Sequence, residues 1–384
     1  MTSDRRNPEG DAERAVRARY SAAAREREAA LCCPVDYDPQ YLSTIPQEVL
    51  ERDYGCGDPS RYVREGDVVL DLGSGAGKIC FIAAQIAGPK GAVIGVDLNE
   101  EMLSLARASA PKVAEALGYA NVEFQRARIQ DLALDLDALD EWLAEHPVRG
   151  GADLAAFEEA SERLRRTSTL VADTSVDLVV SNCVLNLVCE SDRRQLVEEI
   201  FRVLKIGGRI AISDIVSDEG VPDELKADPE LWSGCVSGAF QELELLRALE
   251  AAGFRGIAID KWESEPFAVV EGIEFRSVTI TAHKAEVGPS RDANQALIYR
   301  GPWKAVEDEE GNRFVRGERT AVCAQYFQTL SGTPYADEFV PIRPRDSVPE
   351  AEQPRFQGVG PRGPRETKGA RYRETRKPGQ PGCC

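Results

Sequence analysis

The sequence predicts an α/β fold built on a parallel sheet with helices on both faces. Apolar, strand-like segments alternate with helical segments from about residue 63 to residue 284. A glycine-rich turn, GSGAG at 73–77, follows the first of these strands, and Asp97 closes the second. Alternation of strand and helix is typical of parallel sheets, because each crossover helix returns the chain to the same edge.

A helical cap is expected to precede the sheet, in residues 1–62. Residues 11–30 are rich in Ala, Arg and Glu and predict a helix, which the prolines of LCCPVDYDP end. A second, short helix is expected from about Pro46 and ends near the segment DYGCGDP.

The main domain is expected at 63–286. Its strands are predicted at 63–73, 91–97, 121–129, 175–185 and 207–216, with two last strands in IAIDKWE and FRSVTITAHK. Helices are predicted from the glycine-rich turn to about residue 87, at 100–118, where Pro111 is expected to introduce a kink, at 192–204 and at 240–252. The acidic, Ala/Leu-rich stretch 132–174 interrupts this order and predicts a helical insertion.

Two regions follow the main domain. Residues 287–345 predict a small C-terminal α+β domain, in which DEEGNRF forms a hairpin turn. From 346 to 384 Pro, Gly, Arg and Lys dominate, and this composition predicts a disordered tail that ends in Cys383-Cys384.

Charge and composition exclude several classes of function. The net charge of −18 disfavours nucleic acid and anionic membranes as partners. No apolar run is long enough to span a bilayer and no signal segment is visible, so we expect a cytoplasmic protein, and a monomer. In that compartment, ten cysteines favour thiol chemistry, soft-metal binding or core packing. Having only His146 and His283 disfavours a mixed Cys/His zinc site and a histidine-based triad.

The glycine-rich turn and the two aspartates predict a nucleotide site. VVLDLGSGAG places Asp71 before a GxGxG turn, and Asp97 could accept hydrogen bonds from both hydroxyls of a ribose. Over residues 60–285 this pattern resembles the class I S-adenosylmethionine (SAM) methyltransferases. The resemblance implies SAM as cofactor, with the methionine end near Asp71 and the glycines, the ribose at Asp97 and the adenine at Ile129 and Gln130. The full set of implied cofactor residues is Asp71, Gly73, Ser74, Gly75, Gly77, Asp97, Leu98, Met102, Ile129, Gln130 and Asn182.

Three cysteines lie in unusual surroundings. Cys183 ends the fourth strand in SNCVLNL, at the carboxyl edge where open α/β sheets bind ligands. Cys56 in DYGCGDP and Cys235 in WSGCVSGA lie among glycines and other small residues, which argues against simple core packing. For Cys80, Cys189 and Cys323 we expect ordinary buried thiols, because free cysteine is among the most buried residue types.

DYGCGDP, SNCVLNL and WSGCVSGA, arranged around DLGSGAG, resemble the arsenite methyltransferases. The resemblance extends to RVLKIGGRIAISDI, to an upstream cysteine and to a C-terminal domain. It implies that Cys56, Cys183 and Cys235 are three thiolates that bind As(III), and that Cys32 or Cys33 is a fourth, redox-active thiol. The implied substrate is arsenite or its thiol conjugates, and the implied reductant is thioredoxin or glutathione.

Two other functions remain open from the sequence. One is a SAM methyltransferase that acts on another metalloid or on an organic small molecule, with some cysteines structural. The other is a non-catalytic thiol protein, since four cysteines could form a tetrahedral zinc site. The glycine-rich turn with Asp97 disfavours the second function, because a binding module has no need of a cofactor site.

Overall fold

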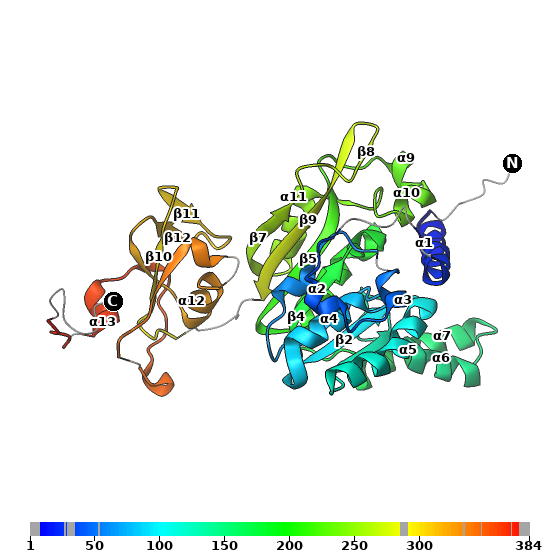
Figure 1. Cartoon of the computed structure of the whole chain (residues 1–384), viewed down its shortest axis with the longest axis horizontal. Helices are drawn as coiled ribbons and strands as arrows, with labels where there is room; N and C mark the ends of the chain where they lie inside the picture. The colour runs from blue at the N-terminus through cyan, green and yellow to red at the C-terminus, as the bar shows by residue number, and fades with distance from the viewer. Residues whose placement is uncertain are drawn as a thin grey trace. The chain divides into compact units, whose positions relative to one another are not determined.

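A computed structural model describes residues 8–26, 28, 35–52, 54–284, 291–332, 335–346, 348–369 and 371–375. The chain divides into two compact units, Met1–Lys284 and Ala285–Cys384 (Figure 1). No helix among the described residues combines the length and hydropathy that crossing a membrane requires.

The first unit is built on one large sheet. Its strands lie in the order β3 (Val122–Arg126), β2 (Ala92–Asp97), β1 (Val68–Leu72), β4 (Val176–Asn182), β5 (Leu204–Ser217), β9 (Ile273–Lys284) and β7 (Phe254–Trp262). The first five are parallel, as predicted, whereas β9 is antiparallel to both of its neighbours. Short strands β6 (Phe240–Gln241) and β8 (Ala268–Val270) pair with β5 and β9. The strand order reverses between β1 and β4, which is where such sheets bind ligands.

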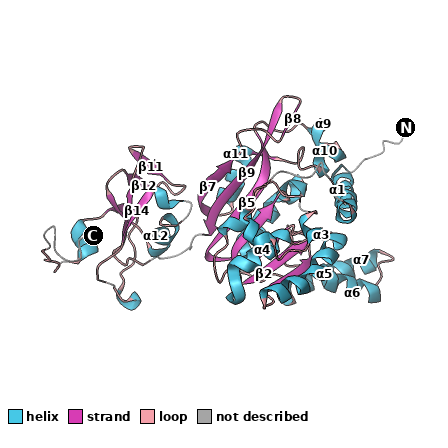
Figure 2. Ribbon diagram, in the orientation of Figure 1, coloured by secondary structure: helices cyan, strands magenta, loops and turns pink. Residues whose placement is uncertain are grey.

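Helices cover both faces of this sheet (Figure 2). α4 (Lys78–Ala87) and α5 (Glu100–Leu117) share one core with Val69 of β1, while α8 (Arg193–Val203) and α11 (Glu242–Ala251) share the other with Leu70. Successive residues of a strand point to opposite faces, so a strand covered on both sides must be apolar throughout. α5 begins at its cap Asn99 and continues through Pro111 as one helix.

The N-terminal region belongs to the same unit. α1 (Pro8–Arg25) packs on α10 (Pro229–Ser233), where the Arg19 guanidinium donates to the carbonyl of Glu230 and to Ser233. A single-turn helix, α3 (Gln47–Leu50), lies where the short helix was expected from about Pro46, and another single-turn helix, α2 (Pro39–Leu42), precedes it. The insertion forms a hairpin of α6 (Leu136–Glu145) and α7 (Gly151–Thr167), as its composition predicts.

The second unit contains a four-stranded sheet in the order β14 (Phe339–Ile342), β10 (Ala296–Tyr299), β13 (Arg319–Ala321) and β15 (Gly360–Pro361). The expected turn at DEEGNRF joins the hairpin β11 (Ala305–Glu307) and β12 (Arg313–Val315). α12 (Ala324–Leu330) supplies Phe327 to a core that also holds Leu297, Phe314 and Phe339.

The prediction of a disordered tail from residue 346 is wrong for the described segment 348–369, which contains regular structure. β15 pairs with β13, and α13 (Pro364–Lys368) follows it. The buried Arg362 donates through its backbone N–H to the Arg319 carbonyl and through its guanidinium to Asp292. These backbone pairs and this buried ion pair hold a segment whose composition contains few apolar residues. Cys383 and Cys384 lie outside the described residues.

A buried histidine makes the stability of the first unit depend on pH. Burial, with the positive charges of Arg209 and Arg64, lowers the pKa of His283 to about 4 from its ordinary 6.5. The folded protein therefore binds fewer protons than the unfolded chain below pH 6.5, so the stability present above that pH is lost as pH falls towards 4. We predict that His283 contributes a loss of about 2 kcal/mol in unfolding free energy between pH 7.5 and pH 5.

Urea denaturation at the two pH values measures this loss. In His283→Gln the dependence should be smaller than in the wild type by that amount, whereas His146→Gln, at the exposed histidine of the insertion, should leave it unchanged. An equal pH dependence in wild type and His283→Gln would contradict the assignment.

Candidate active site

A cavity opens at the carboxyl ends of β1, β2 and β4. It is lined by ten of the eleven residues that the sequence pattern assigned to the cofactor: Asp71, Gly73, Ser74, Gly75, Asp97, Leu98, Met102, Ile129, Gln130 and Asn182. Gly77 is the exception. Its φ of 92° places it at the N-cap of α4, where a Cβ would press on the Phe124 ring, so its role is to let this turn pack.

The turn after β1 brings backbone close to the cavity. Gly73 has a φ of 70°, and a Cβ there would overlap Val184. Gly75 has a φ of 51°, and a Cβ on it would meet no atom within 4 Å. The Ser74 hydroxyl is buried and has no hydrogen-bond partner among the described residues. The turn therefore offers a ligand both space and an unpaired polar atom.

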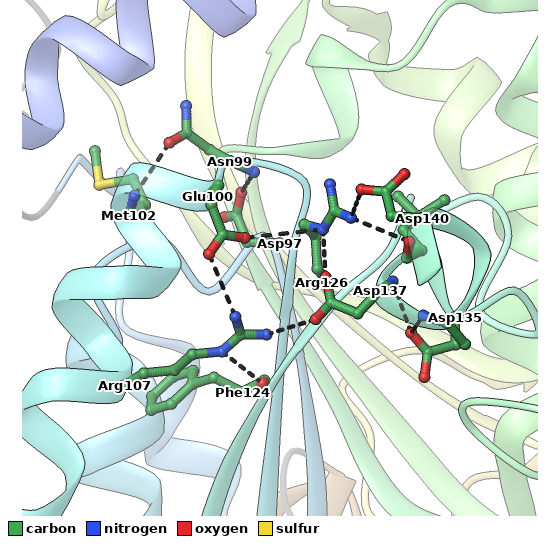
Figure 3. Close-up of polar contacts among 12 residues, drawn as sticks. Asp97, Asn99, Glu100, Met102, Arg107, Phe124, Arg126, Asp135, Asp137 and Asp140 are labelled. Carbon is green, nitrogen blue, oxygen red and sulfur yellow. Dashed lines mark hydrogen bonds and ion pairs between the residues drawn. The ribbon is translucent and has the colours of Figure 1, made fainter. Parts of the chain in front are cut away.

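The carboxylate of Asp97 is held by two backbone N–H groups, of which Figure 3 shows that of Asn99. One oxygen accepts the Gly75 N–H at 2.8 Å, and the other accepts the Asn99 N–H at 2.8 Å. Burial raises the pKa of Asp97, and these backbone donors act in the opposite direction. Since a carboxylate oxygen accepts more than one hydrogen bond, each oxygen can still accept from a ribose hydroxyl.

Asp71 lies at the floor of the cavity and is only 2% exposed. The thiol of Cys80 donates to it at 3.2 Å, and burial together with this carboxylate raises the pKa of Cys80. Cys80 is buried, as expected of it, but it also orients a cavity carboxylate. A carboxylate at this place suits the positive charge at the amino-acid end of SAM.

The helical insertion is joined by ion pairs to the segment that follows Asp97 (Figure 3). Arg107 of α5 and Arg126 of β3 both pair with Glu100, three residues after Asp97, and both also pair with Asp137 of α6. This link was not predictable from the sequence, because it joins charges from three separate segments.

Another part of the cavity wall combines predicted and unexpected residues. Ile129 and Gln130, which the resemblance assigns to adenine, line the cavity, and the Gln130 amide donates to Asp192 at 3.2 Å. Beside them lie residues that sequence reasoning missed or took for ordinary core: Leu187, Val188, Cys189 and Asp192. From the other side, α1 contributes Glu13, Val16, Arg17 and Tyr20.

The three singled-out cysteines come together in one small core cluster, and Cys183 of this cluster also lines the cavity. Cys56, Cys183 and Cys235 are each 4–6% exposed and share one small core cluster. Cys56 and Cys183 form a disulfide, with 5.9 Å between their Cα atoms. The Cys235 thiol donates to the Cys183 carbonyl at 3.2 Å, and the Tyr20 hydroxyl lies 3.8 Å from its sulfur. The structure is thus the oxidised form of this cluster.

In this form no group of three or more Cys, His, Asp and Glu side chains in the described part of the chain is arranged to hold a metal ion. Cys32 and Cys33 lie outside the described residues.

A buried carboxylate that sequence reasoning did not assign fixes the turn that carries Cys183. Asp214 of β5 accepts the N–H groups of Val184 at 3.2 Å and Leu185 at 2.9 Å. Burial raises its pKa to about 7. Cys183 adopts a left-handed conformation with φ 58°, which is uncommon for a residue other than glycine and needs such support.

Comparison with known proteins agrees with this geometry. Residues 64–171 and 149–253 match a family described as a methyltransferase domain, and residues 286–372 match a domain of unknown function. The arsenite methyltransferase of Aquipseudomonas alcaligenes is 30% identical over 326 residues, covering 80% of this chain and 83% of that protein. The human arsenite methyltransferase is 30% identical, covering 79% of this chain and 74% of its own.

A solved structure supports the same relationship. The crystal structure of an arsenic(III) S-adenosylmethionine methyltransferase from Chlamydomonas reinhardtii aligns with a TM-score of 0.56 at 25% identity, covering 85% of this chain and all of that one. The fold, the cavity and these similarities together identify a SAM-dependent methyltransferase that belongs to the arsenite methyltransferase family.

Proposed function

We propose that this enzyme transfers a methyl group from SAM to trivalent arsenic held by Cys56, Cys183 and Cys235. One observation carries the proposal: three buried cysteines from distant segments converge, and Cys183 also lines the cofactor cavity. Thiolate sulfur is a soft ligand and suits a soft, thiophilic centre. A site for arsenic and a site for the methyl donor are therefore adjacent.

Arsenite would enter once the Cys56–Cys183 disulfide has been reduced to two thiols. Each cysteine thiol then replaces one hydroxide of As(OH)₃, and the thiol proton leaves with that hydroxide as water. The product is a pyramidal arsenic with three sulfur ligands and a lone pair. No general base is required, which suits a cluster without a nearby histidine among the described residues.

Bound SAM supplies a methyl group activated by its sulfonium charge. The chain's own contribution is to place the arsenic lone pair in line with that methyl group and to exclude water. Asp97 and the glycine turn would hold the cofactor on one side, while the cysteine cluster holds the arsenic on the other.

Methyl transfer raises the arsenic formally to As(V), so two electrons must return before the next cycle. We propose that protein thiols supply them and become a disulfide, with Cys32 or Cys33 as the additional thiol. Thioredoxin or glutathione would then reduce that disulfide by thiol–disulfide exchange. The enzyme acts as a monomer in this scheme, because all the proposed ligands come from one chain.

The direct test is separation of the arsenic products, with arsenic detection, after incubation of reduced protein with As(III), SAM and thiol. We predict methylated arsenic from the wild type and none from Cys183→Ser or Cys235→Ser. Cys56→Ser should lose the first methylation but retain part of the second, because monomethylated arsenic needs only two bonds to sulfur. Methylation of Sb(III) or an organic acceptor without any methylation of As(III) would contradict the proposal.

The paired cysteines before the second helix should affect the two methylations unequally. Replacing both Cys32 and Cys33 by serine should slow the first methylation more than the second, if their thiols serve the reduction step. The two rates are measured separately, with As(III) and with monomethylated As(III) as substrates. Equal losses in both steps would argue against a redox role.

Cofactor affinity should depend on Asp97 far more than on the insertion. Asp97→Ala removes hydrogen bonds from a charged acceptor to two hydroxyls, so the Kd for SAM should rise by about 10- to 100-fold. Asp137→Asn breaks ion pairs of a residue that is about half exposed, which contribute less than about 1 kcal/mol. Calorimetry of SAM binding measures both, and As(III) binding should be unchanged in either variant. Equal effects of the two substitutions would refute the assignment of Asp97 to the ribose.

A further inference from the structure

Two asparagines flank Cys183 in the segment SNCVLNL, and each contacts a different loop. Asn182 is the last residue of β4, and Asn186 lies in the turn that follows and is 1% exposed. Asn182 faces the loop that carries Cys56, whereas Asn186 faces the loop that carries Cys235. Neither contact is predictable from sequence spacing.

The Asn182 side chain both accepts hydrogen bonds from the Cys56 loop and donates one to it. Its carbonyl oxygen accepts the N–H of Cys56 at 2.8 Å and that of Gly57 at 3.1 Å. Its amide nitrogen donates to the carbonyl of Gly57 at 2.8 Å. A Cβ on Gly55 would overlap this amide, so the glycine is what permits the approach. Asn182 lines the cavity, but its hydrogen bonds go to this loop and, from the amide nitrogen, to the Tyr37 hydroxyl at 3.4 Å.

Asn186 makes the corresponding link to the second loop. Its amide nitrogen donates to the Ile215 carbonyl at 2.6 Å and to the Cys235 carbonyl at 3.4 Å, and its oxygen accepts the Phe240 N–H at 3.3 Å. A Cβ on Gly238 would overlap the backbone of Asn186, so this loop also approaches through a glycine. Cys235 itself has a φ of 60°, a conformation that requires support from its surroundings.

These contacts explain how two loops distant in sequence are kept near Cys183. Cys56 lies 127 residues before Cys183, and Cys235 lies 52 residues after it, so neither loop is kept near Cys183 by chain connectivity. A three-sulfur site needs all three sulfurs around one atom at the same time. The two amides fix the loop backbones and leave every thiol available, so they can act in the reduced state as well as in the disulfide form.

We propose that Asn182 and Asn186 are positioning residues, each responsible for one loop cysteine of the arsenic site. Asn182 presents Cys56 to Cys183, and Asn186 presents Cys235. The inference rests on the proposed function, since it concerns the coordination of the substrate. Loss of one asparagine then removes one particular sulfur, and a site with three sulfurs becomes a site with two.

X-ray absorption at the arsenic edge counts the sulfur atoms bound to As(III) in the reduced protein. We expect three sulfurs in the wild type, and two sulfurs with one oxygen in Asn182→Ala and in Asn186→Ala. If an alanine variant does not fold, Asn182→Leu, which loses the acceptor of the Cys56 N–H, and Asn186→Asp, which loses the donor to the Cys235 carbonyl, provide the same test. The matched control is Asn121→Ala. In the wild type the Asn121 amide donates to the carbonyls of Ala84 and Gly88 and contacts neither cysteine loop, so this variant should keep three sulfurs.

A second measurement, without arsenic, separates the two asparagines. After reduction and removal of the reductant, the rate at which a fixed concentration of oxidised glutathione re-forms the Cys56–Cys183 disulfide reports how closely the Cys56 loop is held. We expect re-formation to slow at least fivefold in Asn182→Ala and to stay within twofold of the wild type in Asn186→Ala. Equal rates in all three proteins would overturn the role of Asn182.

The outcomes distinguish a failure of the proposed function from a failure of the positioning role. Wild-type protein without arsenic–sulfur bonds would overturn the proposed function itself. Three sulfurs in the wild type and three in both asparagine variants would overturn the positioning role alone, as would the loss of all arsenic–sulfur bonds in either variant. Three in the wild type and two in each variant supports the inference.

Discussion

The hydrogen bonds between Asp214 and the turn after β4 are the constraint on which the site depends. They hold Val184 and Leu185 by their N–H groups and so stabilise the left-handed conformation of Cys183. The same turn places Val184 against the glycine turn of the cofactor cavity. A buried carboxylate is costly, and its burial raises its pKa, but backbone donors offset part of that cost. The cysteine cluster proposed to hold arsenic and the cavity proposed to hold SAM are thereby joined at one short segment.

The parallel half of the sheet was predictable because its signals are local. Strands buried on both faces are continuous apolar runs, and the helices between them carry their own periodicity and caps. The antiparallel direction of β9 was not predictable, because it follows from pairing with β5 across a distant connection. The tail was predicted wrongly because its structure does not depend on apolar residues. β15 is held by backbone pairing and Arg362 by an ion pair, and the apolar composition indicates neither.

The candidate site likewise contains residues that the local sequence identifies and residues that only tertiary structure brings to it. Asp71, Asp97 and the glycine turn lie in one motif of fixed spacing, and the structure places them in one cavity. Gly77 shares that spacing, yet it serves the packing of Phe124. Asp192, Asp214 and the residues of α1 reach the cavity only through tertiary structure, and nothing in their local sequence distinguishes them. We could predict that Cys56, Cys183 and Cys235 converge only from the family resemblance, because their spacing in the sequence does not indicate it.

In the proposed mechanism the reduced cysteine cluster holds arsenic beside the SAM methyl group. The most direct test is transfer of a labelled methyl group from SAM to As(III) by one preparation, before and after reduction of the Cys56–Cys183 disulfide. We expect labelled methylarsenic from the reduced protein and none from the oxidised protein assayed without thiol. Equal labelling in the two states, or none in either, would contradict it.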